Sequence, residues 1–147
     1  MKYSEAKIGR AFIIRLEDGD KIPDSIESFA EKNGIRSGMC ILVGGIDDRG
    51  KIVVGPRHGD RMPPDPMAYV LKGAHEAAAV GTIFPDENNK PKLHMHAAMG
   101  RKGKTRTGCV RLGVTVWKMV EIVLIELTGN SARRVKDKAT GFEMLQP

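Results

Sequence analysis

Residues 76–99 read EAAAVGTIFPDENNKPKLHMHAAM and contain two strand-like runs separated by a turn. The first run is Glu76–Phe84 and the second is Lys92–Met99. The sequence Pro85-Asp86-Glu87-Asn88-Asn89 between them consists of residues that favour turns. Because consecutive strands joined by a short turn pair antiparallel, we predict an antiparallel hairpin in this part of the chain.

The rest of the chain extends this pattern and adds one helix. Apolar residues from Ile22 to Ala30 recur at helical spacing, and they predict a helix over Pro23–Asn33. The segment Pro56–Pro66 holds four prolines and is expected to be a loop. Further strand-like runs are Arg10–Leu16, Met39–Val43, Ile52–Val54, Met67–Leu71 and Val114–Leu127. We therefore predict a single α+β domain over residues 1–147, with a mostly antiparallel sheet of about seven strands flanked by one main helix.

Composition restricts the kind of protein. The chain has 147 residues, a formal net charge of +6 and enough apolar residues to bury a core, so we expect a folded domain rather than a disordered chain. Positive charge gathers in Asn88–Val120, which has eight basic residues and no acidic one, whereas the remainder sums to −2. This window either attracts an anionic partner, such as nucleic acid or a small anion, or is a solvated turn.

No segment predicts export or a membrane span. The first seven residues carry charges without an apolar run behind them, so a secretory signal is not expected. The long run Val114–Leu127 is interrupted by three charged residues and falls short of the roughly 20 apolar residues that a span needs. We expect a cytoplasmic protein with no membrane partner, in which Cys40 and Cys109 are core thiols or metal ligands rather than a disulfide.

The sequence Leu93-His94-Met95-His96 points most directly to chemistry. Alternate side chains of a strand face opposite ways, so His94 and His96 share one face while Leu93 and Met95 share the other. Residues i and i+2 lie roughly 6.5–7 Å apart along a strand, a spacing that allows two imidazoles to bind one zinc ion. The pair therefore predicts two metal ligands.

Cys109 is the expected third ligand. If the turn in Arg101-Lys102-Gly103-Lys104 is centred between Lys102 and Gly103, Cys109 lies directly opposite His96 and on the same face. A loop of three residues would send Cys109 to the other face. Two histidines and one cysteine would leave a fourth position open, as catalytic zinc sites do. The alternative interpretation is that Cys109 is a small core residue and that the histidines satisfy backbone groups or solvent.

Other residues carry weaker signals. His75 and Glu76 precede the histidine pair by one strand and are the candidates for proton transfer if the site is catalytic. Gly44-Gly45 lacks the surrounding motif of a phosphate loop and is interpreted as a turn or bulge. The candidates for contact with an anion or nucleic acid are Arg101, Lys102, Lys104 and Arg106.

Several segments, taken in order, resemble the PPC domain, the plant- and prokaryote-conserved domain that plant AT-hook nuclear proteins also carry. The resemblance covers nearly the whole chain. Its segments are RAFIIRLEDGDKIPDSIESFAEKNGI at Arg10–Ile35, GAHE at Gly73–Glu76 with VGTI at Val80–Ile83, LHMHAAMG at Leu93–Gly100, TGCVRLG at Thr107–Gly113, and the tail residues Arg133, Asp137, Thr140-Gly141-Phe142 and Leu145.

The resemblance implies a sandwich-like subunit, with an antiparallel sheet flanked by a helix, that assembles as a homotrimer. Some prokaryotic members hold a metal on histidines that match His94 and His96, together with a histidine that aligns with Cys109. The substitution by cysteine either retains zinc or marks a lost site. DNA binding is the function usually attached to the family, but this chain has no Arg-Gly-Arg-Pro hook.

Two functional hypotheses follow. The first is a stand-alone, homotrimeric PPC protein that binds a metal ion, expected to be zinc, and has a regulatory or DNA-associated role. The second is a metal-dependent enzyme or a sensor that acts on a small anionic molecule. Both place the metal on His94, His96 and Cys109.

Overall fold

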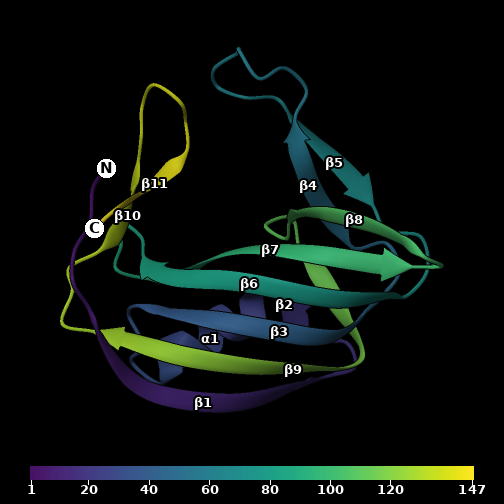
Figure 1. Ribbon diagram of the computed structural model, residues 1–147, viewed down its shortest axis with the longest axis horizontal. Coiled ribbons are helices and arrows are strands. Elements are labelled where there is room, and N and C mark those ends of the chain that lie inside the picture. The colour runs from purple at the N-terminus through teal and green to yellow at the C-terminus, as the bar shows by residue number, and fades with distance from the viewer.

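The computed structural model describes residues 1–147 and shows one large sheet, one helix and a small separate hairpin (Figure 1). The elements are β1 (Lys7–Glu17), β2 (Lys21–Ile22), α1 (Asp24–Lys32), β3 (Gly38–Ile46), β4 (Lys51–Pro56), β5 (Pro66–Val70), β6 (His75–Pro85), β7 (Pro91–Arg101), β8 (Lys104–Cys109), β9 (Val114–Thr128), β10 (Arg133–Lys136) and β11 (Glu143–Gln146). The large sheet has nine strands in the order β1-β9-β3-β6-β7-β8-β4-β5, with β2 paired to β9. All pairings are antiparallel, which confirms the predicted α+β class.

The hairpin β6–β7 forms as predicted from residues 76–99. Its register pairs Val80 with His96 and continues to the turn at Pro85 and Pro91. The Asp86 carboxylate closes that turn, because its Oδ1 accepts the backbone N–H groups of Asn88 at 2.8 Å and Lys90 at 2.9 Å. An aspartate that satisfies nearby backbone donors is a typical turn former.

Side-chain alternation gives the sheet a buried face and an open face. On β7, Leu93 and Met95 are buried in the core, whereas His94 and His96 are exposed on the other side. Helix α1 covers the buried face through Ile26 and Ala30, and Figure 1 shows it behind the sheet. At nine residues α1 is far shorter than a membrane span, and no helix of the structure has the length and apolarity to cross a bilayer.

The structure has more strands than the seven expected. The strands β2, β10 and β11 escaped prediction because two to four residues are too few to show an alternating pattern. The strand β8 is not among the seven predicted runs either, although the expected pairing of Cys109 with His96 assumes it. The predicted helix over Pro23–Asn33 forms but begins and ends one residue inside those bounds. The predicted loop over Pro56–Pro66 is shorter at both ends, because Pro56 and Pro66 pair with each other at the ends of β4 and β5. Pro66 is tolerated because β5 is an edge strand of the sheet, and Pro56 is tolerated because it ends β4 beyond Val53, where β4 pairs with β8.

The glycine pair Gly44-Gly45 is a bulge inside β3 rather than the end of the strand. The register of β3 against β9 shifts between Gly44 and Ile46, and the strand then continues to Ile46. The expected strand over Met39–Val43 is therefore longer at its C-terminal end. A bulge of this kind bends the strand and increases its twist.

The open face of the sheet carries a row of apolar side chains. Adjacent register partners across four strands are Ile13 on β1, Val123 on β9, Ile41 on β3 and Val80 on β6. These four residues, which we call the open-face row, are 46% to 92% exposed. The next partner along the same line is His96, so the row leads directly to the histidine pair.

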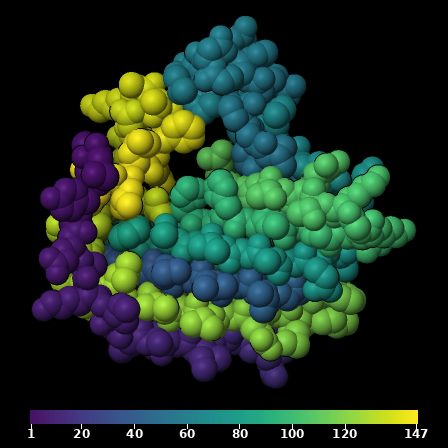
Figure 2. All heavy atoms as spheres, in the orientation of Figure 1, coloured from purple at the N-terminus to yellow at the C-terminus, as the bar shows by residue number.

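Two hairpins project from the large sheet on the same side. One consists of β4 and β5 with residues 57–65 between them, and the other consists of β10 and β11 (Figure 1). Figure 2 shows a hollow between these two projections, bounded by the teal β4–β5 segment and the yellow C-terminal segment. The floor of this hollow contains the candidate site.

Candidate metal centre and ligand cavity

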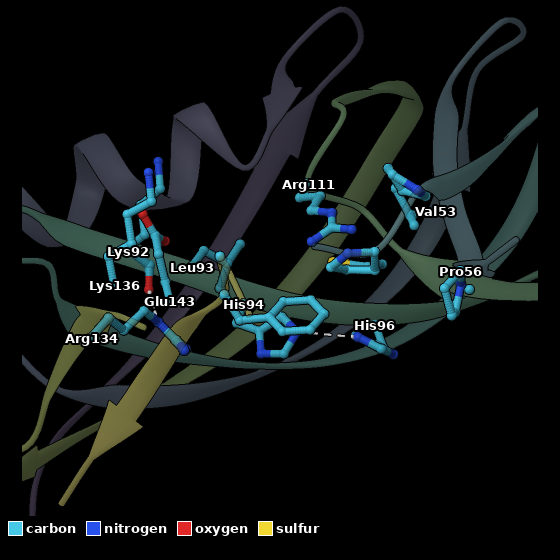
Figure 3. Close-up of a pocket in the computed structure, with 16 residues that line it drawn as sticks. Val53, Pro56, Lys92, Leu93, His94, His96, Arg111, Arg134, Lys136 and Glu143 are labelled. Carbon is cyan, nitrogen blue, oxygen red and sulfur yellow. Dashed lines mark hydrogen bonds between the residues drawn. The ribbon is translucent and has the colours of Figure 1, made fainter. Parts of the chain in front are cut away.

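His94 and His96 point toward one another from β7 (Figure 3). Their Nε2 atoms are 3.2 Å apart and their ring centroids are 5.0 Å apart. Because Leu93 and Met95 anchor the opposite side of the strand in the core, alternation holds both imidazoles on the open face. The predicted shared face of the two histidines is confirmed.

The turn between β7 and β8 brings Cys109 to the histidines. Lys102 and Gly103 form a two-residue turn with φ values of +50° and +71°, the left-handed conformation that such hairpins favour. This turn places Cys109 opposite His96, as the sequence predicted. One ligand atom from each of His94, His96 and Cys109 lies within 4.8 Å of the other two.

Strand β4 comes close to the site beside Cys109. Val53 pairs with Cys109, and a Cβ atom at Gly108 would lie 2.5 Å from the Val53 carbonyl oxygen. Only glycine at position 108 therefore allows the β4 backbone to approach the strand that carries the cysteine. Cys109 is 7% exposed, so it is the most buried of the three candidate ligands.

The donor set fits zinc. Zinc binds imidazole nitrogen and thiolate sulfur at about 2.0–2.3 Å, which places tetrahedral ligand atoms roughly 3.3–3.8 Å apart. Ligand atoms within 4.8 Å of one another reach that spacing by small side-chain rotations. Burial, followed by the nearby charges of Arg134, His96 and Arg111, lowers the pKa of His94. His94 is therefore neutral at pH 7, the protonation state that binds a metal.

A cavity of about 600 Å³ opens over the three candidate ligands. His94, His96 and Cys109 lie among its lining residues, and the β4–β5 and β10–β11 hairpins form opposite sides (Figures 2 and 3). Pro56 and Pro66 line the first side. The volume lies in the range of small-molecule binding sites, roughly 300–1,000 Å³.

Arg134 is built into the wall of this cavity and is only 6% exposed. Its guanidinium donates to the Thr82 hydroxyl at 3.1 Å and to the carbonyl oxygens of Thr82 and Lys92 at 3.4 Å. The same group lies 5.8 Å from the centre of the Phe84 ring. These contacts hold β10 against β6 and β7 and fix a positive charge near His94.

The lining of the cavity is rich in cations. Arg134 is accompanied by Arg111, Lys136 and Lys92, and Glu143 is the single carboxylate that lines the cavity. Lys92 forms an ion pair of 3.8 Å with Glu27, whereas Arg111 and Lys136 form no ion pair and no side-chain hydrogen bond within the chain. Figure 3 shows Arg134, Lys136 and Glu143 on the His94 side and Val53 and Pro56 on the His96 side.

Sequence analysis missed the residues that the C-terminal segment contributes. Arg134, Lys136 and Phe142 reach the cavity only because β10 and β11 fold over the end of β7, and these strands are too short to predict. One signal was present, since Arg134 and Lys136 have the same i, i+2 spacing as the histidine pair and share a face of β10. Arg111 was counted in the basic window without a role.

The two candidates for proton transfer lie away from the metal ligands. Glu76 is on the open face, but it lies four residues from Val80, the partner of His96, which is roughly 13 Å along the strand. His75 is on the opposite, buried face, with its Nδ1 2.8 Å from the Gly73 carbonyl oxygen. Neither residue lines the cavity.

The four basic residues predicted to contact an anion lie at the far end of the β7–β8 hairpin and outside the cavity. Arg101 donates to the Ala74 carbonyl oxygen at 2.7 Å, and the Arg106 guanidinium lies 5.3 Å from the centre of the Tyr69 ring. Lys102 and Lys104 are exposed and form no ion pair. Of the four basic residues, only these two lysines have side chains without an ion-pair, hydrogen-bond or cation–π partner within the chain.

The fold and the site define a small antiparallel α+β domain with a candidate metal centre. Residues 3–128 match the profile of the Plants and Prokaryotes Conserved (PCC) domain. The protein therefore belongs to this family, the PPC domain family that the sequence resembles. No curated protein gave a significant match.

Solved structures of prokaryotic proteins share the fold. The PPC protein of Pyrococcus horikoshii is 23% identical with a TM-score of 0.82, and the alignment covers 98% of this chain and 99% of that one. A metal-containing protein of Archaeoglobus fulgidus is 22% identical with a TM-score of 0.85 over 100% of both chains. A protein of Ralstonia eutropha, named a "putative DNA-binding protein", is 21% identical with a TM-score of 0.70 over 92% of this chain and 90% of that one.

Proposed function

We propose that the protein is a zinc-dependent binding protein in which His94, His96 and Cys109 hold the metal at the floor of a ligand cavity. The main support for this proposal is that one ligand atom from each of the three residues lies within 4.8 Å of the other two, inside a cavity of about 600 Å³. The name of the metal-containing Archaeoglobus fulgidus neighbour supports this proposal. Zinc on three protein ligands supplies a Lewis acid with a further position for a small molecule.

The remaining lining residues suit a small anionic molecule. Arg111 and Lys136 offer positive charges that form no ion pair within the chain, with Glu143 as the one carboxylate of the lining. Pro56 and Pro66 present apolar surface that excludes water, and excluding water strengthens each electrostatic contact inside the cavity. The chain's own residues would therefore attract, orient and desolvate an anion beside the metal.

Ligand binding is better supported than catalysis. A metal-dependent enzyme would need a group that moves a proton within hydrogen-bond reach of the bound molecule. The candidates Glu76 and His75 do not line the cavity. The enzyme stays a second hypothesis, and it requires turnover of a small anion that is lost when a chelator removes the metal.

A DNA-associated role is a further candidate, favoured by the exposed Lys102 and Lys104 at the hairpin tip and by the name of the Ralstonia eutropha neighbour. Lysines that contact phosphate release counterions, so binding that uses them weakens steeply with salt. The candidate predicts duplex DNA binding that persists at about 200 mM salt on a preferred sequence and weakens in a double Lys102→Gln, Lys104→Gln variant. Binding that disappears equally from all sequences would leave electrostatic attraction alone.

We also propose that copies of the chain associate through the open-face row, as a homotrimer. Ile13, Val123, Ile41 and Val80 form a continuous apolar line across four strands, and nothing within the chain covers it. Contiguous exposed apolar surface of this kind marks interaction sites in soluble domains. The homotrimer implied by the family resemblance is the assembly that we expect to bury it.

Metal content tests the proposed function. The wild type, purified without chelator, is expected to hold about one zinc ion per chain by elemental mass spectrometry. His94→Ala and Cys109→Ala are expected to lose it. Cys40→Ala is the matched control, because Cys40 is fully buried in the core on β3, which is separated from β7 by β6. A metal-free wild type, or equal zinc in Cys109→Ala and Cys40→Ala, would contradict the proposal.

A further inference from the structure

We infer that the cavity takes a small organic oxyanion, a carboxylate or phosphate ester on a compact apolar body, and that the β10–β11 hairpin selects it. The inference rests on the proposed function, since it names the class of molecule that the metal-floored cavity takes. The hairpin lies outside residues 3–128, the part of the chain that matches the family profile. The inference goes beyond the proposed function because it assigns recognition of the oxyanion to residues of the β10–β11 hairpin and to Arg111.

Positive charge is placed around the candidate ligands by separate segments of the chain. Arg111 follows β8, and Arg134 belongs to β10, yet both line the cavity that contains His94. Cations from two separate segments therefore line the same cavity, and Figure 3 shows Arg134 and Lys136 on the His94 side with Arg111 apart from them. Guanidinium groups bind carboxylates and phosphates through paired, charge-assisted hydrogen bonds.

These cations differ in how many of their N–H groups already donate hydrogen bonds within the chain. Arg134 already donates to Thr82 and Lys92, so it contributes mainly a fixed charge. Arg111 and Lys136 form no ion pair and no side-chain hydrogen bond within the chain, and Glu143, the register partner of Lys136, is the one carboxylate of the lining. Their donors are the ones available to an oxyanion.

Part of the cavity lining is apolar. Phe142 from the C-terminal segment and Pro56 and Pro66 from the β4–β5 hairpin line the same cavity. The two sides approach one another above the site, because a Cβ atom at Gly141 would lie 3.5 Å from Cβ of Pro63. A molecule held by its oxyanion near Arg111 and Lys136 would therefore place its apolar body between proline and phenylalanine side chains.

Hydrogen bonds within the β10–β11 hairpin fix the turn that presents Lys136 and Phe142. Asp137 Oδ2 accepts the Thr140 hydroxyl at 2.6 Å and the Thr140 backbone N–H at 3.1 Å. The Gly141 N–H donates to the Asp137 carbonyl oxygen at 2.8 Å. A turn closed by its own aspartate and anchored at Arg134 presents Lys136 and Phe142 with little ordering cost, and preordering favours binding.

Titration of the full, zinc-loaded chain with three probes tests the inference by calorimetry. Phenyl phosphate and benzoate carry the two oxyanions on the same apolar ring, and benzamide carries the ring without the charge. We expect at least one anion to bind and benzamide to bind at least about tenfold more weakly. The anion that binds more tightly identifies phosphate or carboxylate as the natural group.

Variants of the recognition residues complete the experiment. Arg111→Met and Lys136→Met are each expected to weaken anion binding about tenfold, while zinc content stays unchanged. Lys138→Met is the matched control, because Lys138 is an exposed lysine of the same hairpin that does not line the cavity. Its affinity is expected to match the wild type.

Failure of this inference differs from failure of the proposed function. Zinc-loaded protein that binds neither anion, binds benzamide equally well, or loses as much affinity in Lys138→Met as in Lys136→Met would overturn the inference alone. A metal-free wild type that still binds an anion through Arg111 and Lys136 would uphold the inference and overturn the zinc site. Circular dichroism of each variant confirms that these exposed substitutions leave the fold intact.

Discussion

The two cysteines of the chain are surrounded by different groups. Cys40 is fully buried in the core, and burial raises the pKa of its thiol to about 11, so it stays protonated at neutral pH. Cys109 instead lies beside two imidazoles at the floor of a cavity. A thiolate ligand needs partner groups of that kind, and only Cys109 has them.

The ion pair of Arg10 with Glu126 predicts a pH dependence of stability. Arg10 Nε donates to Glu126 Oε2 at 2.8 Å and Arg10 Nη2 to Oε1 at 2.8 Å, and these hydrogen bonds lower the pKa of Glu126 to about 2. Because this pKa is depressed in the folded state, the contribution is complete above the unfolded value near 4.5 and is lost as pH falls toward 2. Glu126→Gln should lower the free energy of unfolding by about 1 kcal/mol at pH 7, since Arg10 is partly exposed.

Denaturant titration at a series of pH values measures this contribution. The difference between the wild type and Glu126→Gln should be constant above about pH 5 and shrink steadily below it. A difference that is the same at pH 3 and pH 7 would show that Glu126 stabilises the fold through packing rather than through its charge.

At the scale of elements, the β7–β8 hairpin determines whether the site exists. Its turn holds both Lys102 and Gly103 at positive φ, which a β-branched residue adopts only with strain. Gly103→Val should destabilise the protein by about 1–2 kcal/mol and weaken zinc binding, because the pairing of Cys109 with His96 depends on this turn.

Thermal unfolding with and without zinc measures both effects of Gly103→Val. The matched control is Gly59→Val, since Gly59 lies in the β4–β5 connection, where nothing within 4 Å would meet a Cβ atom and φ is not positive. Equal zinc affinity in Gly103→Val and the wild type would contradict the link between turn geometry and the metal centre.

The sequence predicts this hairpin but not the C-terminal one, and the reason is physical. In β7 and β8 a two-residue turn and strict alternation translate spacing directly into facing side chains, so the grouping of His94, His96 and Cys109 follows from residue numbers. In β10 and β11 the strands are short, and their position over the cavity depends on the contacts of Arg134 with β6 and β7. Contacts between distant segments leave no local pattern to detect.

In the sheet as a whole, too, features with a local sequence pattern could be predicted and features that depend on distant contacts could not. The antiparallel class and the helix follow from runs and periodicity, whereas the strand order, with β9 between β1 and β3, joins segments far apart in the chain. The cavity depends on this order, because it forms where β4, β7 and the C-terminal segment meet. Sequence analysis therefore identified the candidate metal ligands without the cavity above them.

At the scale of the whole molecule, the open-face row predicts self-association. Val80 is 56% exposed at the end of this apolar line next to His96, and a charge there would have to be buried on assembly. Val80→Asp should convert the expected homotrimer to a monomer while the fold persists, because the side chain points away from the core.

Light scattering after size-exclusion chromatography measures that change. Thr105→Asp, at an exposed position of β8 outside the row, controls for the added negative charge. A wild type that is monomeric at micromolar concentration, or a Val80→Asp variant of unchanged mass, would contradict the proposed assembly.

The central claim is that Cys109 completes a metal centre with the two histidines, and cobalt(II) spectroscopy tests it most directly. Cobalt occupies tetrahedral sites in place of zinc, and a thiolate ligand adds a sulfur-to-metal charge-transfer band in the near ultraviolet. We predict that the cobalt-loaded wild type shows this band, that Cys40→Ala keeps it and that Cys109→Ser loses it. A wild type without the band, or the same band in Cys109→Ser, would contradict the account.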